Sequence, residues 1–376
     1  MKKLQMVDLK SQYDKIKDTV NTSIQEVLDT NTYINGPQVH QFQKNLEEYL
    51  DVKHVIPCAN GTDALQIAMM GLGLKPGDEV ITADFTFAAT VEVIALLQLT
   101  PVLVDVDMFN MNISLEAIKK AITPKTKAIV PVHLFGRAAN MEAIMAIAKE
   151  HNLYVIEDNA QAIGANCKFS DGTKKKAGVI GNVGATSFFP SKNLGCYGDG
   201  GAIFTNDDAL AHTIRGIVNH GMYERYHHDV VGVNSRLDSI QAAVLNAKLP
   251  LLDQYNAARQ NAARKYTAAF EGHKNIIAPS ICEICDCHVF HQYVLRILDA
   301  DRDALMQHLL NKGIPCAIYY PIPLHSQKAY LDSRYKEEDF PVTNQLVKEV
   351  IALPMHTELD DEQIKFITDS VLEFLK

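Results

Sequence analysis

The chain has 376 residues, of which 47% are apolar and 22% are charged, a composition typical of globular proteins. Its net charge of -9 argues against nucleic-acid binding, which requires a basic surface. No segment approaches the roughly 18 consecutive apolar residues of a membrane span, and no apolar run follows the first lysines as in a signal peptide. We therefore expect a cytoplasmic protein without a membrane partner.

Short apolar strands alternate with amphipathic helices over the first two-thirds of the chain. The strands are expected at residues 54–58, 80–82, 102–106, 128–132 and 154–157. The helices between them are expected at residues 62–74, 87–97, 114–121 and 141–150, the third with Ser114 as its N-cap. This alternation predicts an α/β fold with a doubly wound, mostly parallel sheet.

An Ala- and Leu-rich pattern over residues 245–266 predicts one long helix that leads into a second lobe. The elements expected in that lobe are a strand at 289–297 and helices at 303–311, 342–351 and 361–375. Because these elements are fewer and mixed, we expect a large α/β domain at residues 1–245 and a smaller α+β domain at residues 246–376.

Seven cysteines are scattered along the chain, which argues against a disulfide scaffold. Cys282, Cys285, Cys287 and His288 are spaced like metal ligands, but the chain has no second C-x-x-C pair to complete such a site. We therefore predict a loop with reduced thiols and no bound metal, and the role of the cluster stays open.

Ligands of open α/β sheets bind beyond the carboxyl ends of the strands, so functional residues are expected at the strand-to-loop junctions. At the first junction Gly61 and Thr62 begin a helix, whose free N–H groups and Thr62 hydroxyl suit a phosphate. An ordinary helix cap by Thr62 or Asp63 explains the same residues. At the second junction Phe87 could stack on a planar ring or be a core residue.

Two charged residues stand at later junctions. Asp158 ends the buried strand 154–157, where its carboxylate needs a partner such as a protonated pyridine nitrogen, a salt bridge or a helix N-terminus. Lys192 lies in a loop between two apolar strands. A desolvated lysine can lose its proton and form a Schiff base, whereas most lysines are surface residues. Ser187, five residues earlier, can donate to a phosphate.

Together these residues supply the parts of a pyridoxal 5'-phosphate (PLP) site: a phosphate cradle, a ring platform, a carboxylate for the ring nitrogen and a lysine. Further motifs accompany them: Asp8-Leu9, Gly61-Thr62-Asp63-Ala64-Leu65, Glu157-Asp158, residues 187–192, Gly198-Asp199-Gly200-Gly201, Gly232-Val233-Asn234-Ser235-Arg236-Leu237-Asp238 and Tyr320-Pro321-Ile322-Pro323-Leu324-His325. With these motifs nearly the whole chain resembles the DegT/DnrJ/EryC1/StrS sugar aminotransferases, a branch of the fold-type-I PLP enzymes.

The resemblance implies a role for each matching residue around the cofactor ring. Lys192 would hold the cofactor covalently, Asp158 would pair with its ring nitrogen, and Gln161 would lie near its phenolic oxygen. The implied reaction is ping-pong transamination from glutamate to a nucleotide-linked keto-sugar, in which the freed Lys192 amine moves the proton. Some relatives that dehydrate sugars carry histidine at the lysine position, so Lys192 favours amino transfer.

The remaining cofactor contacts are implied in the same way. Gly61, Thr62 and Ser187 would bind the phosphate, and Phe87 would stack on the ring. Asn234 would reach the phosphate of the neighbouring subunit's cofactor, which implies a homodimer with shared active sites.

The sugar is suggested by residues 187–197 and 226–228, which resemble the subgroup acting on UDP-2-acetamido-2-deoxy-3-keto-glucuronate for a surface polysaccharide such as lipopolysaccharide. Aminotransferases of dTDP-3-keto-6-deoxyhexoses, or of 4-keto-sugars, share much of the pattern and are the alternative. The candidate substrate contacts are Phe189, Arg236, Tyr320 and His325. Arg236 suits a carboxylate, or a salt bridge between subunits.

An alternative of a different class is a non-catalytic protein of the same fold, a regulator or binding module, against which the intact Lys192 and Asp158 argue. A nicotinamide enzyme is disfavoured because no G-x-G-x-x-G follows an early strand. The sequence departs from the family at Asn159, where small residues are commoner, and in a long loop at 168–183. The lysines at 174–176 in that loop predict a solvated face, or a contact with a nucleotide diphosphate.

Overall fold

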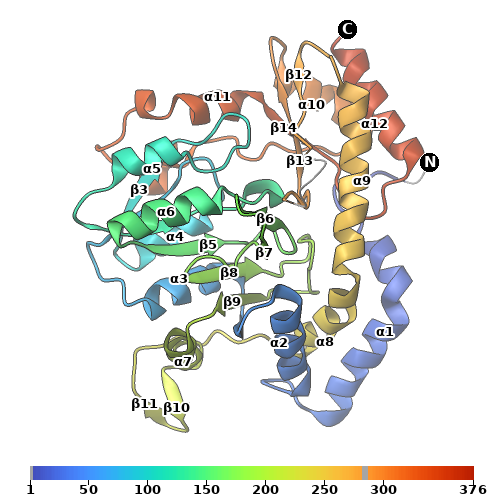
Figure 1. Cartoon of the computed structure of the whole chain (residues 1–376). Coiled ribbons are helices and arrows are strands. Elements are labelled where there is room, and N and C mark those ends of the chain that lie inside the picture. Colours follow the sequence, from blue (N-terminus) through green and yellow to red (C-terminus); the bar gives the residue numbers. More distant parts are fainter. Residues whose placement is uncertain (1–2, 282–286) are drawn as a thin grey trace.

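A computed structural model describes residues 3–281 and 287–376. The larger lobe is built on a seven-stranded sheet with the order β1-β9-β8-β5-β4-β2-β3, and the smaller lobe on a three-stranded sheet, β12-β13-β14 (Figure 1). The strands of the large sheet are β1 (His54–Cys58), β2 (Glu79–Ala83), β3 (Thr100–Val104), β4 (Thr126–Val130), β5 (Tyr154–Asp158), β8 (Val183–Ser187) and β9 (Gly201–Thr205).

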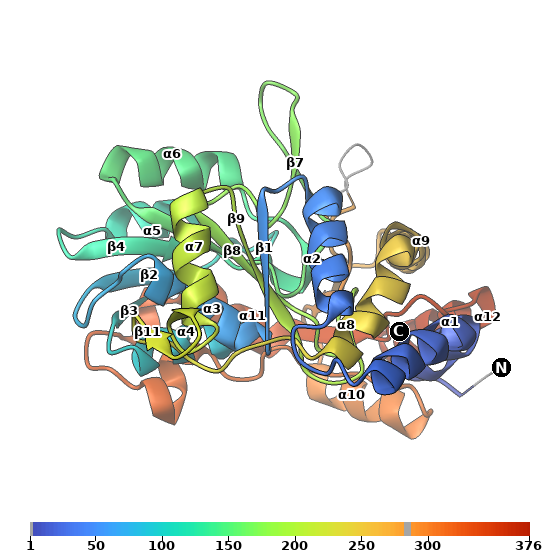
Figure 2. The same ribbon diagram turned by 90° about the horizontal axis from the view of Figure 1, so that it is seen from below.

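Neighbouring strands from β3 to β8 pair in parallel, while β9 runs antiparallel to both β8 and β1. One face of this sheet is covered by α3 (Gly61–Gly71), α4 (Ala89–Leu96) and α7 (Asp208–Ile217), and the other by α5 (Leu115–Ala121) and α6 (Met141–His151). Figure 2 shows α6 on one side of the strands and α3 and α4 on the other. The predicted doubly wound, mostly parallel sheet is confirmed.

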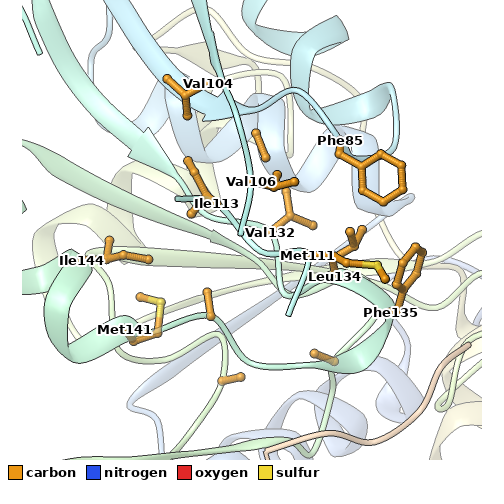
Figure 3. Close-up of a cluster of buried hydrophobic side chains, with 14 of the residues drawn as sticks. Phe85, Val104, Val106, Met111, Ile113, Val132, Leu134, Phe135, Met141 and Ile144 are labelled. Atoms are coloured by element: carbon orange, nitrogen blue, oxygen red, sulfur yellow. The ribbon is translucent and has the colours of Figure 1, made fainter. Parts of the chain in front are cut away.

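Residues next to each other on a strand point to opposite faces, and this fills both cores. Ile129 of β4 joins the cluster under α5 and α6, whereas Ala128 and Val130 join the one under α3 and α4. Figure 3 shows the first cluster, in which Phe85 and Phe135 face each other, their ring centroids 6.3 Å apart. Ser114 caps α5 as predicted, because its hydroxyl accepts the N–H of Ala117 at 3.3 Å.

A third core supports the segment that carries Lys192. It lies between α2 (Pro37–Leu50) and α8 (Ser239–Lys248), and it contains Phe188 and Leu194 from the loop between β8 and β9. The sequence analysis assigned neither α2 nor the preceding helix α1 (Leu9–Thr30), which packs on α8. The loop therefore rests on helices that are distant in the sequence.

The prediction of one helix over residues 245–266 is wrong. Helix α8 ends at Lys248, a 3-10 turn spans Leu249–Leu251, and α9 (Leu252–Phe270) follows. The cause is Pro250, which lacks a backbone N–H and cannot continue an α-helical hydrogen-bond pattern.

The small lobe contains α10 (Arg302–Asn311), α11 (Pro341–Glu349), α12 (Asp361–Phe374), β12 (Ile276–Ile277), β13 (Tyr293–Ile297) and β14 (Val350–Leu353). The helix predicted to reach residue 351 ends at Glu349, and its buried apolar tail forms β14. The strand predicted from residue 289 begins only at Tyr293. The N-terminal segment also packs on this lobe, because Leu4 joins its core and Met6 accepts the N–H of Met355 at 3.2 Å. The boundary at residues 245/246 stays a prediction.

A hairpin of β6 (Asn166–Lys168) and β7 (Lys174–Lys176) overlaps the long loop predicted at residues 168–183. This hairpin projects from the body of the lobe (Figure 2). The amine of Lys175 lies over the ring of Phe169, and that of Lys176 over Tyr49. A second hairpin joins β10 (Met222–Glu224) to β11 (His227–His228). Within the described ranges, no helix is long and apolar enough to span a bilayer.

Cys282 and Cys285 lie outside the described residues, and Cys287 is partly buried. Among residues 3–281 and 287–376, no group of three or more His, Cys, Asp or Glu side chains could hold a metal ion.

The core beneath the Lys192 loop gives a stability prediction. Phe42 is fully buried, with its ring 5.3 Å from that of Phe188 in an edge-to-face contact. Phe42→Ala should destabilise the fold by about 3–5 kcal/mol, because the large cavity cannot collapse fully. Thermal denaturation measures the effect, with Phe109→Ala as control because Phe109 is 83% exposed. Equal midpoints for the two variants would contradict the packing described here.

Candidate active site

Three strand ends meet at one edge of the large sheet. Asp158 at the end of β5 lies opposite Ala185 of β8, and Ser187 at the end of β8 lies opposite Gly201 of β9. Gly201 in turn lies opposite Cys58, the last residue of β1. Because β9 runs antiparallel, the loop that contains Lys192 begins and ends at this same edge. The pairing therefore brings together the junctions singled out in the sequence.

The first junction forms a narrow cradle at the start of α3. A Cβ added to Gly61 would lie 2.6 Å from the Cβ of Ser187, and one added to Gly201 would lie 2.4 Å from the carbonyl carbon of Asn60. Only glycines allow this approach. Asn60 caps the helix by accepting the N–H of Asp63 at 2.8 Å, so Thr62 and Asp63 are not the cap. The Thr62 hydroxyl is thus available beside the first N–H groups of the helix, a setting that suits a phosphate.

Asp158 is buried and is held by two donors. The hydroxyl of Thr90 on α4 donates to its Oδ2 at 2.7 Å, and the N–H of Ala160 donates to its Oδ1 at 3.1 Å. The carboxylate is therefore fixed by these two hydrogen bonds, and the charge of Lys192 also acts on it. A fixed, buried carboxylate of this kind can stabilise a protonated ring nitrogen.

The residue before Asp158 anchors the strand end from the opposite side. The fully buried carboxylate of Glu157 accepts the N–H groups of Gly178, Ile180 and Gly181 at 2.6 to 2.8 Å and contacts His133 Nε2 at 2.9 Å. These four partners satisfy a group whose burial would otherwise be costly.

Gln161 is oriented at both ends of its amide. Its Oε1 accepts the N–H of Phe135 at 2.6 Å, and its Nε2 donates to the hydroxyl of Tyr320 at 3.1 Å. Tyr320 comes from the small lobe, and its ring lies 6.2 Å from Phe87 and 6.4 Å from Phe135. The small lobe therefore closes over the sheet edge at this point.

The sequence left open whether Phe87 is a core residue. It is not, because 56% of its surface is exposed. Phe189, in the loop before Lys192, is 50% exposed. Exposed aromatic rings beside buried polar groups are suited to stacking on a ligand.

Lys192 as a whole residue is partly exposed, but its amine is buried. Burial lowers the pKa of its amine to about 8, and the nearby negative charge of Asp158 opposes that shift. Behind the loop, Lys248 is 1% exposed and donates from Nζ to the carbonyl of Gly195 at 2.8 Å. Because its pKa is lowered, the amine of Lys192 is uncharged over a larger pH range than that of an ordinary lysine.

The predicted sugar contacts occupy different settings. His325 is buried on Asp84, which accepts both its backbone N–H and its Nδ1 at 2.7 Å, so the Nε2 side of its ring remains for a ligand. Arg236 makes one long bond, 3.4 Å, to Asn219. Asn234 is exposed, and Ser235 next to it accepts the N–H of Ala59 at 3.1 Å, beside the phosphate cradle.

A family model matches residues 14–372 of the chain. The chain belongs to the DegT/DnrJ/EryC1/StrS aminotransferase family. It is 46% identical to a Pseudomonas aeruginosa protein named UDP-2-acetamido-2-deoxy-3-oxo-D-glucuronate aminotransferase, over 97% of this chain and 98% of that one. It is 44% identical to a UDP-N-acetyl-3-dehydro-α-D-glucosamine 3-aminotransferase of Acidithiobacillus ferrooxidans, over 96% of this chain and 94% of the relative.

A Geobacillus stearothermophilus relative, 44% identical over 99% of this chain and 98% of its own, is named a pleiotropic regulatory protein. Among solved structures, DesV of S. venezuelae in complex with a ketimine intermediate superposes with a TM-score of 0.94. The match covers 100% of this chain and 99% of that chain at 36% identity. These findings confirm the predicted fold and an aminotransferase function.

Aminotransferases of this family use PLP, and the residues at the sheet edge fit that cofactor. The Gly61–Ser187 cradle suits its phosphate, the fixed Asp158 suits its ring nitrogen, and the desolvated Lys192 suits its aldehyde. When bound, PLP supplies an electron-withdrawing ring that stabilises negative charge on a substrate carbon.

Thr90, Glu157, His133 and Asp84 were given no role in the sequence analysis. Glu157 is the last residue but one of β5, and Asp84 directly follows β2. A buried acid near a strand end needs donors, so both residues carried a usable signal. Thr90 and His133 carried none, because their partners lie far away in the sequence.

Thr90 provides a test of this geometry. Thr90→Val keeps the shape but leaves Asp158 without its hydroxyl donor, so kcat should fall about tenfold, since a hydrogen bond to a charged group contributes about 1.5–3 kcal/mol. Thr82→Val is the matched control, because the buried Thr82 hydroxyl donates to Val130 O at 2.9 Å. The control should lose stability while keeping kcat. Native kcat in Thr90→Val would show that Asp158 does not depend on Thr90.

Proposed function

We propose that this aminotransferase, a cytoplasmic homodimer, moves the amino group of glutamate to carbon 3 of UDP-2-acetamido-2-deoxy-3-keto-glucuronate, for a surface polysaccharide. The observation that carries the choice of sugar is the 46% identity, over 97% of the chain, with the P. aeruginosa enzyme named for that substrate. A dTDP-3-keto-6-deoxyhexose or a 4-keto-sugar is the alternative acceptor.

In this proposal Lys192 and Asp158 are the catalytic residues. Lys192 would attach the cofactor, Asp158 would pair with its ring nitrogen, and Gln161 would lie near its phenolic oxygen. The freed Nζ of Lys192 would take the proton from the α-carbon of glutamate as a general base and then, as a general acid, pass it on to the cofactor. A pKa of about 8, lowered by burial, leaves part of this amine uncharged near neutral pH, as a general base requires.

The phosphate of the cofactor would be bound by Gly61, Thr62 and Ser187, and Phe87 would stack on the ring. Asn234 completes the site from the second subunit. Its exposure supports this role, and so does the adjoining exposed surface at Tyr226 and Val231, which are 75% and 86% exposed.

The sugar nucleotide is bound by Phe189, Arg236, Tyr320 and His325. Arg236 carries the specificity for a uronic acid, because a guanidinium binds a carboxylate through two parallel hydrogen bonds. Its single long bond to Asn219 leaves the group available for such a ligand.

A substrate panel with glutamate as donor tests the acceptor. We expect the highest kcat/KM with UDP-2-acetamido-3-keto-glucuronate. Arg236→Gln should lower that value about tenfold or more while changing the 3-keto-glucosamine analogue little, because the analogue has no carboxylate. Product is measured by mass spectrometry, and Arg225→Gln in the exposed hairpin is the control. Preference for a dTDP-6-deoxyhexose, or equal loss on both UDP sugars, would overturn the uronate assignment.

Hybrid dimers test the shared site. Lys192→Ala and Asn234→Ala should each inactivate or weaken both sites of a homodimer. A hybrid of the two variants, isolated with two different tags, should regain about half the native activity, because one site then has an intact lysine and an intact asparagine from the other chain. A hybrid no more active than the Asn234→Ala homodimer would place Asn234 in its own subunit's site.

A further inference from the structure

Lys192 is followed by a buried asparagine that contacts two other parts of the fold. Asn193 is 4% exposed, and its Nδ2 donates to Asn256 Oδ1 at 2.7 Å and to the carbonyl of Val289 at 2.9 Å. The carbonyl of Val289 can only accept, so this contact fixes which end of the Asn193 amide is the nitrogen. Among the described residues its Oδ1 has no hydrogen-bond partner, so the link depends on the nitrogen alone.

Asn256 extends this link to the segment that carries the ring-binding residues. It lies on α9, is 5% exposed, and donates from Nδ2 to the carbonyl of Ile163 at 3.2 Å. Ile163 follows Gln161 by two residues. Gly164 makes the approach possible, because a Cβ at that position would lie 2.5 Å from Asn256 Nδ2. The two asparagines thus connect the Lys192 loop with the Asp158–Gln161 segment.

The contact with Val289 adds the small lobe to the same connection. Two residues further on, His291 is buried beside Lys192. Burial lowers the pKa of this histidine, and the charges of Lys192 and Arg259 lower it further. The charge of Lys192 therefore acts on this segment, two residues from the carbonyl that holds Asn193.

We propose that Asn193 is a positioning residue, which together with Asn256 sets the place of Lys192 relative to the ring-binding segment and the small lobe. An amine that has to attach a cofactor and then move a proton needs a fixed backbone below a mobile side chain, because small misplacements of a reacting group cost large factors in rate. Lys248 holds the same loop at Gly195, three residues after Lys192. Asn193 supplies the second fixed point, next to the reacting residue.

The test measures attachment of PLP to the cofactor-free protein, trapped on Lys192 with borohydride at a series of pH values. The native rate should rise with pH up to about 8, because the amine must be uncharged. Asn193→Ala should attach PLP about tenfold more slowly. Its midpoint should move upward from 8, since a loosened loop hydrates the amine and relieves the burial that lowered its pKa. In turnover kcat should fall more than KM changes.

Two further variants separate positioning from general stability. Asn246→Ala is the matched control, because Asn246 accepts from Asn45 at 3.1 Å and donates to Gln38 O at 2.9 Å between α2 and α8. It should lower the melting temperature and leave the rate and midpoint of attachment unchanged. Asn256→Ala should reproduce Asn193→Ala, and the double variant should be no slower, because the two residues act as a unit.

A native rate and midpoint in Asn193→Ala would overturn the inference. If that variant does not fold, Asn256→Ala carries the same comparison, because it removes one of the same hydrogen bonds. The assignment rests on the proposed role of Lys192 but not on the sugar, since attachment needs no acceptor. Failure of the native protein to attach PLP at Lys192 would instead overturn the proposed function.

Discussion

The burial of one amine is the constraint on which the rest of the site depends. A charged lysine loses much of its hydration in this environment, and the pKa of Lys192 falls to about 8 although Asp158 stands nearby to favour the charge. Such a group stays in place only if its surroundings are fixed. The structure fixes them through the bonds to Asn193 and Lys248, the core beneath Phe188, and the donors that hold Asp158. Each of these serves the same small volume at the edge of the sheet.

The two lobes divide this task. The large lobe contributes the cradle, the carboxylate and the lysine, all from strand ends that the sheet brings into register. The small lobe contributes the carbonyl of Val289, which holds Asn193, and the hydroxyl of Tyr320, which orients Gln161. Ligand recognition and the position of the lysine are therefore linked mechanically.

Much of this could be predicted from the sequence because short apolar runs between helices leave few alternatives. The strands of the parallel sheet, the junction residues Asp158 and Lys192, and the cap at Ser114 follow from local patterns. Prediction from local pattern failed at Pro250, because the apolar periodicity continues across a residue that breaks the helix. It also failed at β14, where a buried apolar segment resembles the end of a helix. Thr90 and Asn193 were missed for another reason. Their partners stand 68 and 63 residues away, and only the folded sheet brings them into contact.

The reversed direction of β9 has a consequence for the order of events in the life of the chain. This strand pairs with β8 and also with β1, so the loop between β8 and β9 takes its final shape only when the N-terminal third of the chain is in place. Before that point Lys192 is hydrated and carries its proton, as any lysine with a pKa near 10.4 does, and it reacts poorly with an aldehyde. Uptake of the cofactor therefore has to follow the folding of this sheet. The chain becomes able to take up its cofactor only after the pairing of β9 with β8 and β1 has formed.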